Sequence, residues 1–179
     1  VLKYGIYKML KTGAEHLESL RDGRQVYIGG EKVLDVTDHP AFRNAARSFA
    51  MLYDKKSLPE NRDIMSFEED GDVYSSWFLM PRSAEDLQKR FETHRRIAEW
   101  THGLLGRSPD HVASFVTGLA MRPDMFENIK EGFGENIRAY YQYMRKNDIF
   151  ACYTVLPPQG ARKPELYQRE GMKVPTLRV

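Results

Sequence analysis

The chain has 179 residues, of which 41% are hydrophobic and 29% are charged, and its formal net charge is +2. This composition is typical of a soluble folded domain, and it excludes a disordered chain and a strongly basic nucleic-acid-binding protein. No apolar run approaches the roughly 18–20 residues that span a bilayer, so no membrane partner is expected. A single cysteine, Cys152, excludes an internal disulfide framework, and the histidines lack a metal-ligand spacing. We therefore expect a cytoplasmic protein without a metal site.

The first predicted elements are a short helix and a hairpin. Thr12 and Glu15 have the spacing of a capping box, which predicts that a helix begins there. Two β-prone runs, residues 25–28 and 31–36, flank Gly29-Gly30. A glycine pair between two such runs predicts a β-hairpin.

A longer helix and a second hairpin are predicted next. Residues 37–40 read Thr-Asp-His-Pro, a helix-start pattern, and apolar residues then recur at helical spacing over 42–53. Pro59 either ends this helix or begins a short successor. Asp70-Gly71 predicts the turn of a hairpin, and residues 73–78 form its better strand.

Three further helices follow. Ser83 begins a capping box for a helix that closes near residues 103–106. Ser108-Pro109 begins the next helix, which Arg122-Pro123 stops. After a glycine-containing loop, apolar residues from Ile137 onward predict a last helix to about Asn147.

The helix after Ser83 carries the densest basic stretch, Lys89, Arg90, Arg95 and Arg96, interleaved with acidic residues. Mixed charges at this spacing favour a solvated helix face with i,i+4 ion pairs. The tyrosines of the last helix, Tyr140, Tyr141 and Tyr143, are interpreted as core and surface residues.

The character of the chain changes near Asp148. Residues 149–156 are strand-like, and Pro157-Pro158 ends the pattern. We therefore predict an N-terminal helical domain over 1–148 and the beginning of a β-domain over 149–179. One strand with a polar tail cannot bury itself, so the second domain is expected to be truncated.

Two constellations are candidate sites. Arg107 directly precedes a predicted helix N-terminus and His111 lies one turn further on, an arrangement that suits an anionic ligand such as a phenolate or carboxylate. The alternative, which spacing alone favours, is that Arg107 pairs with Asp110 or with a neighbouring helix end. Gln159 and Arg162 follow the proline pair and could hold a planar, partly anionic ligand, or they belong to an ordinary linker. Taken alone, these residues establish only a mostly helical domain.

The same residues carry a family resemblance. The ordered segments resemble the N-terminal region of the 4-hydroxyphenylacetate 3-hydroxylase family: TGAEHLESLRDGR, YIGGEKVLDVTDHPAFRNAARSFAMLYD, GRSPDHVASFVTGLA and FGENIRAYYQYMRKNDIFACYTVLPPQGAR. The likeness extends over nearly the whole chain from Thr12. It implies an acyl-CoA-dehydrogenase-like architecture, mainly α with short hairpins, assembled as a homotetramer.

The resemblance also implies an activity. The monooxygenases of this family hydroxylate phenols ortho to the hydroxyl group with O2 and reduced FAD, which a separate NAD(P)H-dependent flavin reductase supplies. The substrate is then a phenolic small molecule or a carrier-bound tyrosine-like group. The family's dehydratase branch needs cysteines for an iron–sulfur cluster, and the lone Cys152 cannot supply them.

Residue by residue, Arg107 matches the substrate-binding arginine of the family's GRSPD motif. His111 stands where the phenylacetate hydroxylases have a substrate-contacting tyrosine, and Tyr153 where they have a histidine that binds the phenolic oxygen. Gln159 and Arg162 match the FAD-contacting ends of an NPQxxR segment. We expect this stretch alone to be inactive, and the competing hypothesis is a non-catalytic helical assembly module.

Overall fold

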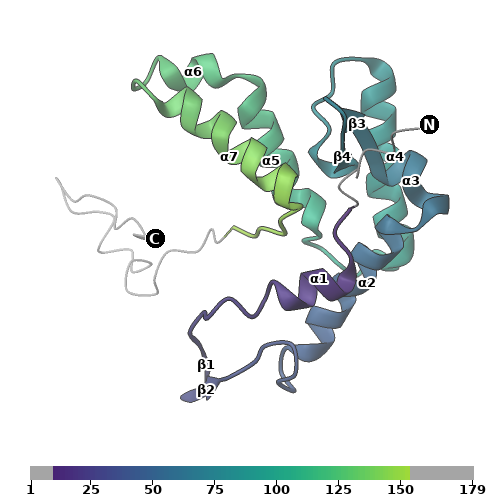
Figure 1. Cartoon of the computed structure of the whole chain (residues 1–179), viewed down its shortest axis with the longest axis vertical. Helices are drawn as coiled ribbons and strands as arrows, with labels where there is room; N and C mark the ends of the chain where they lie inside the picture. Colours follow the sequence, from purple (N-terminus) through teal and green to yellow (C-terminus); the bar gives the residue numbers. More distant parts are fainter. Residues whose placement is uncertain (1–9, 154–179) are drawn as a thin grey trace, which may run out of the picture.

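The computed structural model describes residues 10–153 (Figure 1). These residues form seven α-helices, two 3-10 helices and two antiparallel hairpins. The predicted class, mainly α with short β-hairpins, is confirmed. In Figure 1, α5, α6 and α7 form one group, α3, α4 and the second hairpin another, and α1, α2 and the first hairpin a third.

The predicted capping box begins the first helix, α1 (Gly13–Glu18). Thr12 Oγ1 accepts a hydrogen bond from the Glu15 amide at 3.3 Å, and the Glu15 carboxylate accepts one from the Thr12 amide at 2.7 Å. The helix packs against α2, and the Gly13 amide donates to Asp54 Oδ1 at 2.7 Å. A Cβ on Gly13 would lie 2.4 Å from the Ala50 carbonyl oxygen, so this close approach requires glycine.

The predicted hairpin at Gly29-Gly30 is also confirmed. Strands β1 (Val26–Ile28) and β2 (Glu31–Val33) pair antiparallel, with Val26 opposite Val33. Gly29 and Gly30 have φ angles of +56° and +86°, which side chains rarely adopt.

Helix α2 (Arg43–Ser57) begins later than predicted from residues 37–40. The Thr37 amide and hydroxyl both donate to the Asp35 carboxylate at 2.7 Å, and the Ala41 amide donates to His39 Nδ1. These local hydrogen bonds hold the Thr-Asp-His-Pro segment in turns, so the predicted helix start was wrong. After α2, a short successor does begin at Pro59, as η1 (Pro59–Asn61) followed by α3 (Arg62–Met65).

The second hairpin turns at Asp70 and Gly71, as predicted, and joins β3 (Ser66–Glu69) to β4 (Asp72–Ser75). The predicted strand to residue 78 is too long, because a 3-10 helix, η2 (Ser76–Phe78), takes its last three residues. Trp77 and Phe78 are both fully buried. Consecutive strand residues point to opposite faces, so the tighter turn is what brings both rings into the core.

The predicted long helices are α4 (Ala84–Trp100), α5 (Pro109–Met121) and α7 (Phe133–Asn147). A short helix, α6 (Pro123–Glu127), was not predicted, because Pro123 occupies its first turn as well as ending α5. Glu127 accepts hydrogen bonds from the amides of Gly132 and Gly134, which ties α6 to the start of α7.

The core lies where α2, η2, α4, α5 and α7 meet, and the Tyr141 hydroxyl there donates to the Phe78 carbonyl oxygen at 2.7 Å. Tyr140 and Tyr143 are exposed, in agreement with their interpretation as surface residues. The buried cluster comprises Leu52, Tyr53, Met65, Trp77, Phe78, Ile97, Ala113, Val116, Ala120, Tyr141 and Met144.

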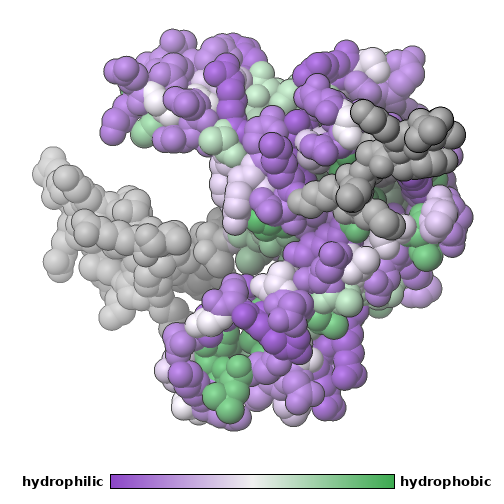
Figure 2. Space-filling view, viewed as in Figure 1, coloured by the Kyte–Doolittle hydropathy of each residue, from purple (hydrophilic) through white to green (hydrophobic). Residues whose placement is uncertain are grey.

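The surface is mainly hydrophilic, with an apolar patch over the first hairpin in the lower part of the view (Figure 2). On α4, Arg95 pairs with Glu92 and Glu99, as the solvated-face interpretation predicted. Arg90 departs from it, because its guanidinium turns inward to the carbonyl oxygens of Trp77 and Leu79. Within residues 10–153, no helix combines the length and apolar character that crossing a membrane requires.

Helix α7 ends at Asn147, and Asp148 follows with a left-handed φ of +48°. Residues 149–153 adopt no strand, and the rest of the predicted strand lies outside the described residues. The division into domains 1–148 and 149–179 therefore stays a prediction.

Candidate active site

Arg107, His111 and Tyr153 lie together at the start of α5. His111 Nε2 is 3.3 Å from the Tyr153 hydroxyl, and the two rings stack with centroids 5.4 Å apart. The Arg107 guanidinium carbon lies 4.9 Å from the centroid of the Tyr153 ring. The structure thus brings together three residues that sequence reasoning named, two from one helix start and one from the segment after α7.

Arg107 does not pair with Asp110, which was the competing interpretation. The Asp110 carboxylate instead accepts hydrogen bonds from Ser108 and binds His94 Nδ1 on α4. Within residues 10–153, Arg107 forms no hydrogen bond or ion pair, and Tyr153 is 39% exposed. The guanidinium donors of Arg107 are therefore available to a ligand.

A cleft of about 600 Å³ opens beside this cluster along α5. Phe115 supplies an apolar wall, with its ring edge-on to both His111 and Tyr153. The cleft is lined by His94, Asp110, His111, Ser114, Phe115, Gly118 and Leu119.

The pair formed by His94 and Asp110 was missed at the sequence level. Burial acts to raise the pKa of Asp110, but hydrogen bonds from His94 and Ser108 outweigh it and hold the pKa below its usual value. The two residues come from different helices, so no spacing rule on one helix predicts their contact. Asp110 was named only as a possible partner of Arg107.

The cluster suits an aromatic ligand with a negatively charged oxygen. An unpaired guanidinium favours an anion, and the His111–Tyr153 pair adds hydrogen-bonding groups beside an apolar wall. Such an arrangement stabilises a phenolate relative to the neutral phenol. Gln159 and Arg162, the other predicted site residues, lie outside the described residues.

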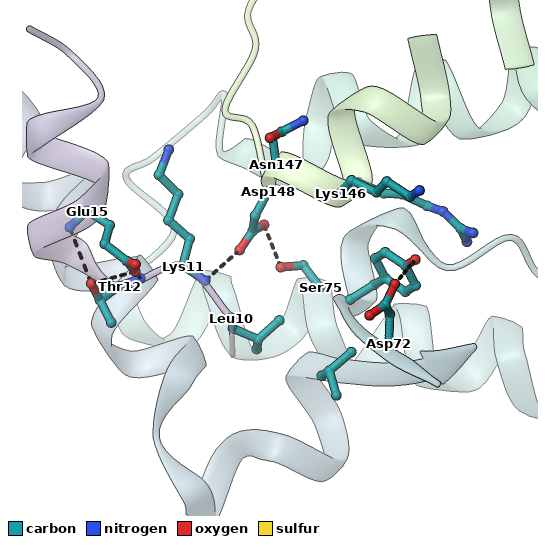
Figure 3. Close-up of a pocket in the computed structure, with 12 residues that line it drawn as sticks. Leu10, Lys11, Thr12, Glu15, Asp72, Ser75, Lys146, Asn147 and Asp148 are labelled. Atoms are coloured by element: carbon teal, nitrogen blue, oxygen red, sulfur yellow. Dashed lines mark hydrogen bonds between the residues drawn. The ribbon is translucent and has the colours of Figure 1, made fainter. Parts of the chain in front are cut away.

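A second pocket of about 590 Å³ lies between α1, β4 and the end of α7 (Figure 3). Beneath it, Lys56 is fully buried and forms an ion pair with Asp148. Ser75 donates to Asp148 at 2.6 Å and accepts from Lys56 at 3.0 Å. The Tyr53 hydroxyl donates to the Asp148 carbonyl oxygen at 3.0 Å. These contacts join α2, β4 and α7, so we interpret this cluster as structural.

The chain is similar to known proteins of one family. Residues 12–179 match the family model described as the N-terminal part of 4-hydroxyphenylacetate 3-hydroxylase. The chain is 37% identical over 155 residues to the oxygenase component of 4-hydroxyphenylacetate 3-monooxygenase from Thermus thermophilus. That match covers 86% of this chain and 31% of the relative.

A second relative, from Streptomyces globisporus, is 40% identical over 152 residues, which cover 82% of this chain and 28% of the relative. Its name describes a monooxygenase for a 3-amino-3-(3-chloro-4-hydroxyphenyl)propanoyl group on a peptidyl-carrier protein. The chain thus spans about a third of the length of these relatives.

Among solved structures, a 4-hydroxyphenylacetate 3-monooxygenase oxygenase component complexed with FAD and 4-hydroxyphenylacetate is 37% identical, with a TM-score of 0.79. The match covers 87% of this chain and 32% of that one. The extent of the family match and the shared fold lead to one assignment: the chain belongs to the 4-hydroxyphenylacetate 3-hydroxylase family, to whose N-terminal region it corresponds.

Proposed function

We propose that this chain is part of the oxygenase component of a two-component FAD-dependent monooxygenase. The substrate class is a phenol, free or attached to a carrier protein, and the new hydroxyl group enters ortho to the existing one. The observation that carries the proposal is the convergence of Arg107, His111 and Tyr153 beside an apolar cleft.

Each residue has a role in this proposal. A phenolate is a better nucleophile than a phenol, so the site must favour the anion when the ring reacts with the activated oxygen. Arg107 supplies the fixed positive charge, and the His111–Tyr153 pair orients the phenolic oxygen by hydrogen bonding. Phe115 packs on the organic part of the substrate and keeps water from it.

A separate NAD(P)H-dependent reductase would deliver reduced FAD, and the reduced FAD would supply the activated oxygen. The solved relative with bound FAD supports this cofactor. The residues assigned to FAD by resemblance, Gln159 and Arg162, lie outside the described part of the chain. The role derived for residues 10–153 is therefore confined to the phenol. Assembly as a homotetramer and a cytoplasmic location stay predictions.

The deciding experiment is product formation by the complete protein with a flavin reductase, NADH, O2 and a panel of phenols. We expect a catechol product whose added oxygen carries the label when labelled O2 is used. NADH consumption that yields only hydrogen peroxide with every phenol would overturn the proposal and favour the non-catalytic helical module.

A further inference from the structure

His94 and Asp110 form a polar pair at the wall of the same cleft. His94 Nδ1 binds the Asp110 carboxylate, and the Asp110 side chain is only 11% exposed. The His94 side chain is 37% exposed and lines the cleft together with His111. Because Nδ1 is held by the carboxylate, Nε2 is the nitrogen left for a ligand.

Hydrogen bonds and neighbouring charges determine which atoms of the His94–Asp110 pair can accept a proton. Asp110 is kept ionised by its hydrogen bonds, and a carboxylate that accepts from Nδ1–H leaves the neutral imidazole with an unprotonated Nε2. Among residues 10–153, the other charged or titratable groups near the pair are Arg90 on α4, which interacts electrostatically with Asp110, and His111 on α5, which lines the same cleft. Tyr141 of α7 interacts electrostatically with Arg90. Arg90 is engaged by Ser114 Oγ at 2.7 Å and by two backbone carbonyl oxygens.

His111 and Tyr153, at the two positions matched to substrate-contacting residues of the family, are less suited to accept a proton. His111 Nε2 already contacts the Tyr153 hydroxyl, and no carboxylate is seen to orient the His111 ring among residues 10–153. Tyr153 is itself a phenol, and a phenol hydroxyl is too weak a base to take a proton from another phenol. His94 binds the buried carboxylate of Asp110 through Nδ1 and keeps Nε2 available, which is the arrangement of a general base.

We propose that His94 is the proton acceptor for the phenolic substrate and that Asp110 is its positioning residue. The phenolic O–H bond breaks, the proton moves to His94 Nε2, and the electron pair stays on the oxygen. The products of this step are a phenolate, stabilised by Arg107, and an imidazolium, stabilised by Asp110. The proposal rests on the proposed function because it assigns a proton acceptor for that substrate.

The first test measures ionisation of a bound phenol without flavin. 4-Nitrophenol is suitable because its phenolate absorbs visible light and its neutral form does not. We expect the complete, flavin-free protein to bind 4-nitrophenol mainly as the phenolate at a pH where most of the free compound is neutral. Binding as the neutral phenol by the unaltered protein would overturn the proposal.

Two variants distinguish a role of His94 in proton transfer from a purely structural contact with Asp110. His94→Asn places an amide donor near the position of Nδ1, so it keeps the contact with Asp110 but removes the basic nitrogen. His94→Gln removes the base and places its amide further out. We expect both variants to lose the phenolate signal, whereas Arg95→Gln, an exposed neighbour on α4, should retain it. A His94→Asn variant with the full phenolate signal would show that the pair is only structural.

Turnover gives a second readout. Loss of a general base lowers the rate about 10²–10⁴-fold. We expect kcat of His94→Asn to fall at least about 100-fold near pH 7 and to recover as the pH rises and the phenol ionises in water. An unchanged kcat and pH profile would refute the role of His94 while the proposed function stands.

If neither variant folds, the imidazole ¹⁵N shifts of His94 in the unaltered protein test the proposal, because binding of 4-nitrophenol must protonate Nε2. Shifts that do not change on binding would overturn it.

Discussion

The buried ion pair between Lys56 and Asp148 predicts a large and specific stability change. Burial lowers the pKa of Lys56 to about 8 against the opposing effect of Asp148, so the ammonium group is still charged at pH 7. It lies 4.0 Å from the Tyr53 ring centroid and 4.2 Å from that of Trp77. Lys56→Met keeps much of the side-chain volume but removes the charge, and it leaves the Asp148 carboxylate buried without its cation.

The size of the effect follows from that uncompensated charge. Removing one partner of a buried ion pair costs about 3–5 kcal/mol of the free energy of unfolding. Lys55→Met is the matched control on the same helix. Lys55 is only half-buried and lies 5.6 Å from the centroid of the Trp100 ring, so its loss should cost less than about 1 kcal/mol. Adding Asp148→Asn to Lys56→Met should restore about 1–3 kcal/mol, because the amide is neutral.

Urea unfolding, followed by tryptophan fluorescence and circular dichroism, measures the unaltered chain, the three single variants Lys56→Met, Lys55→Met and Asp148→Asn, and the double variant. A loss below about 1 kcal/mol for Lys56→Met, similar to the control, would refute the structural interpretation of the cluster. So would a double variant that is as unstable as the sum of its two single substitutions.

Two further predictions concern α1. Burial, with Lys11 and Lys56 nearby, lowers the pKa of His16 from 6.5 to about 4, so the unfolded chain binds a proton that the folded chain does not. The free energy of unfolding should therefore fall by about 3 kcal/mol as the pH drops from about 6.5 to about 4. His16→Phe, which keeps a ring stacked on Tyr53, should flatten this dependence in urea titrations at several pH values. An unchanged slope would contradict this assignment. Gly13→Ala should cost about 1–3 kcal/mol, because its Cβ meets the Ala50 carbonyl oxygen, whereas Gly118→Ala on α5 has open space and should gain about 0.5–1 kcal/mol in the same assay. Equal effects of the two glycine substitutions would contradict the packing argument.

Local signals predicted most of the fold. The capping boxes at Thr12 and Ser83 and the glycine turns of both hairpins depend on residues within four positions of one another, and all four features are present. The errors arose where another contact competes with the local pattern. Asp35 holds Thr37 in a turn, and burial of adjacent aromatic side chains replaces the end of the second strand with a 3-10 turn.

The candidate site divides in the same way. Arg107 and His111 were found from their spacing around a helix start, and Tyr153 from the family resemblance. His94 and Asp110 meet across two helices, and Lys56 lies 92 residues from Asp148. Contacts between distant segments leave no periodic pattern, so sequence reasoning on one chain could not pair these residues.

The dissociation constants of the complete protein for a phenol and for reduced FAD, before and after Arg107→Ala, test the central claim most directly. A hydrogen bond to a charged group contributes about 1.5–3 kcal/mol, and each 1.4 kcal/mol corresponds to a tenfold change in affinity. We predict that Arg107→Ala weakens phenol binding about 10- to 100-fold and leaves the affinity for FAD nearly unchanged. Equal loss of both affinities would contradict the account and make Arg107 a structural residue.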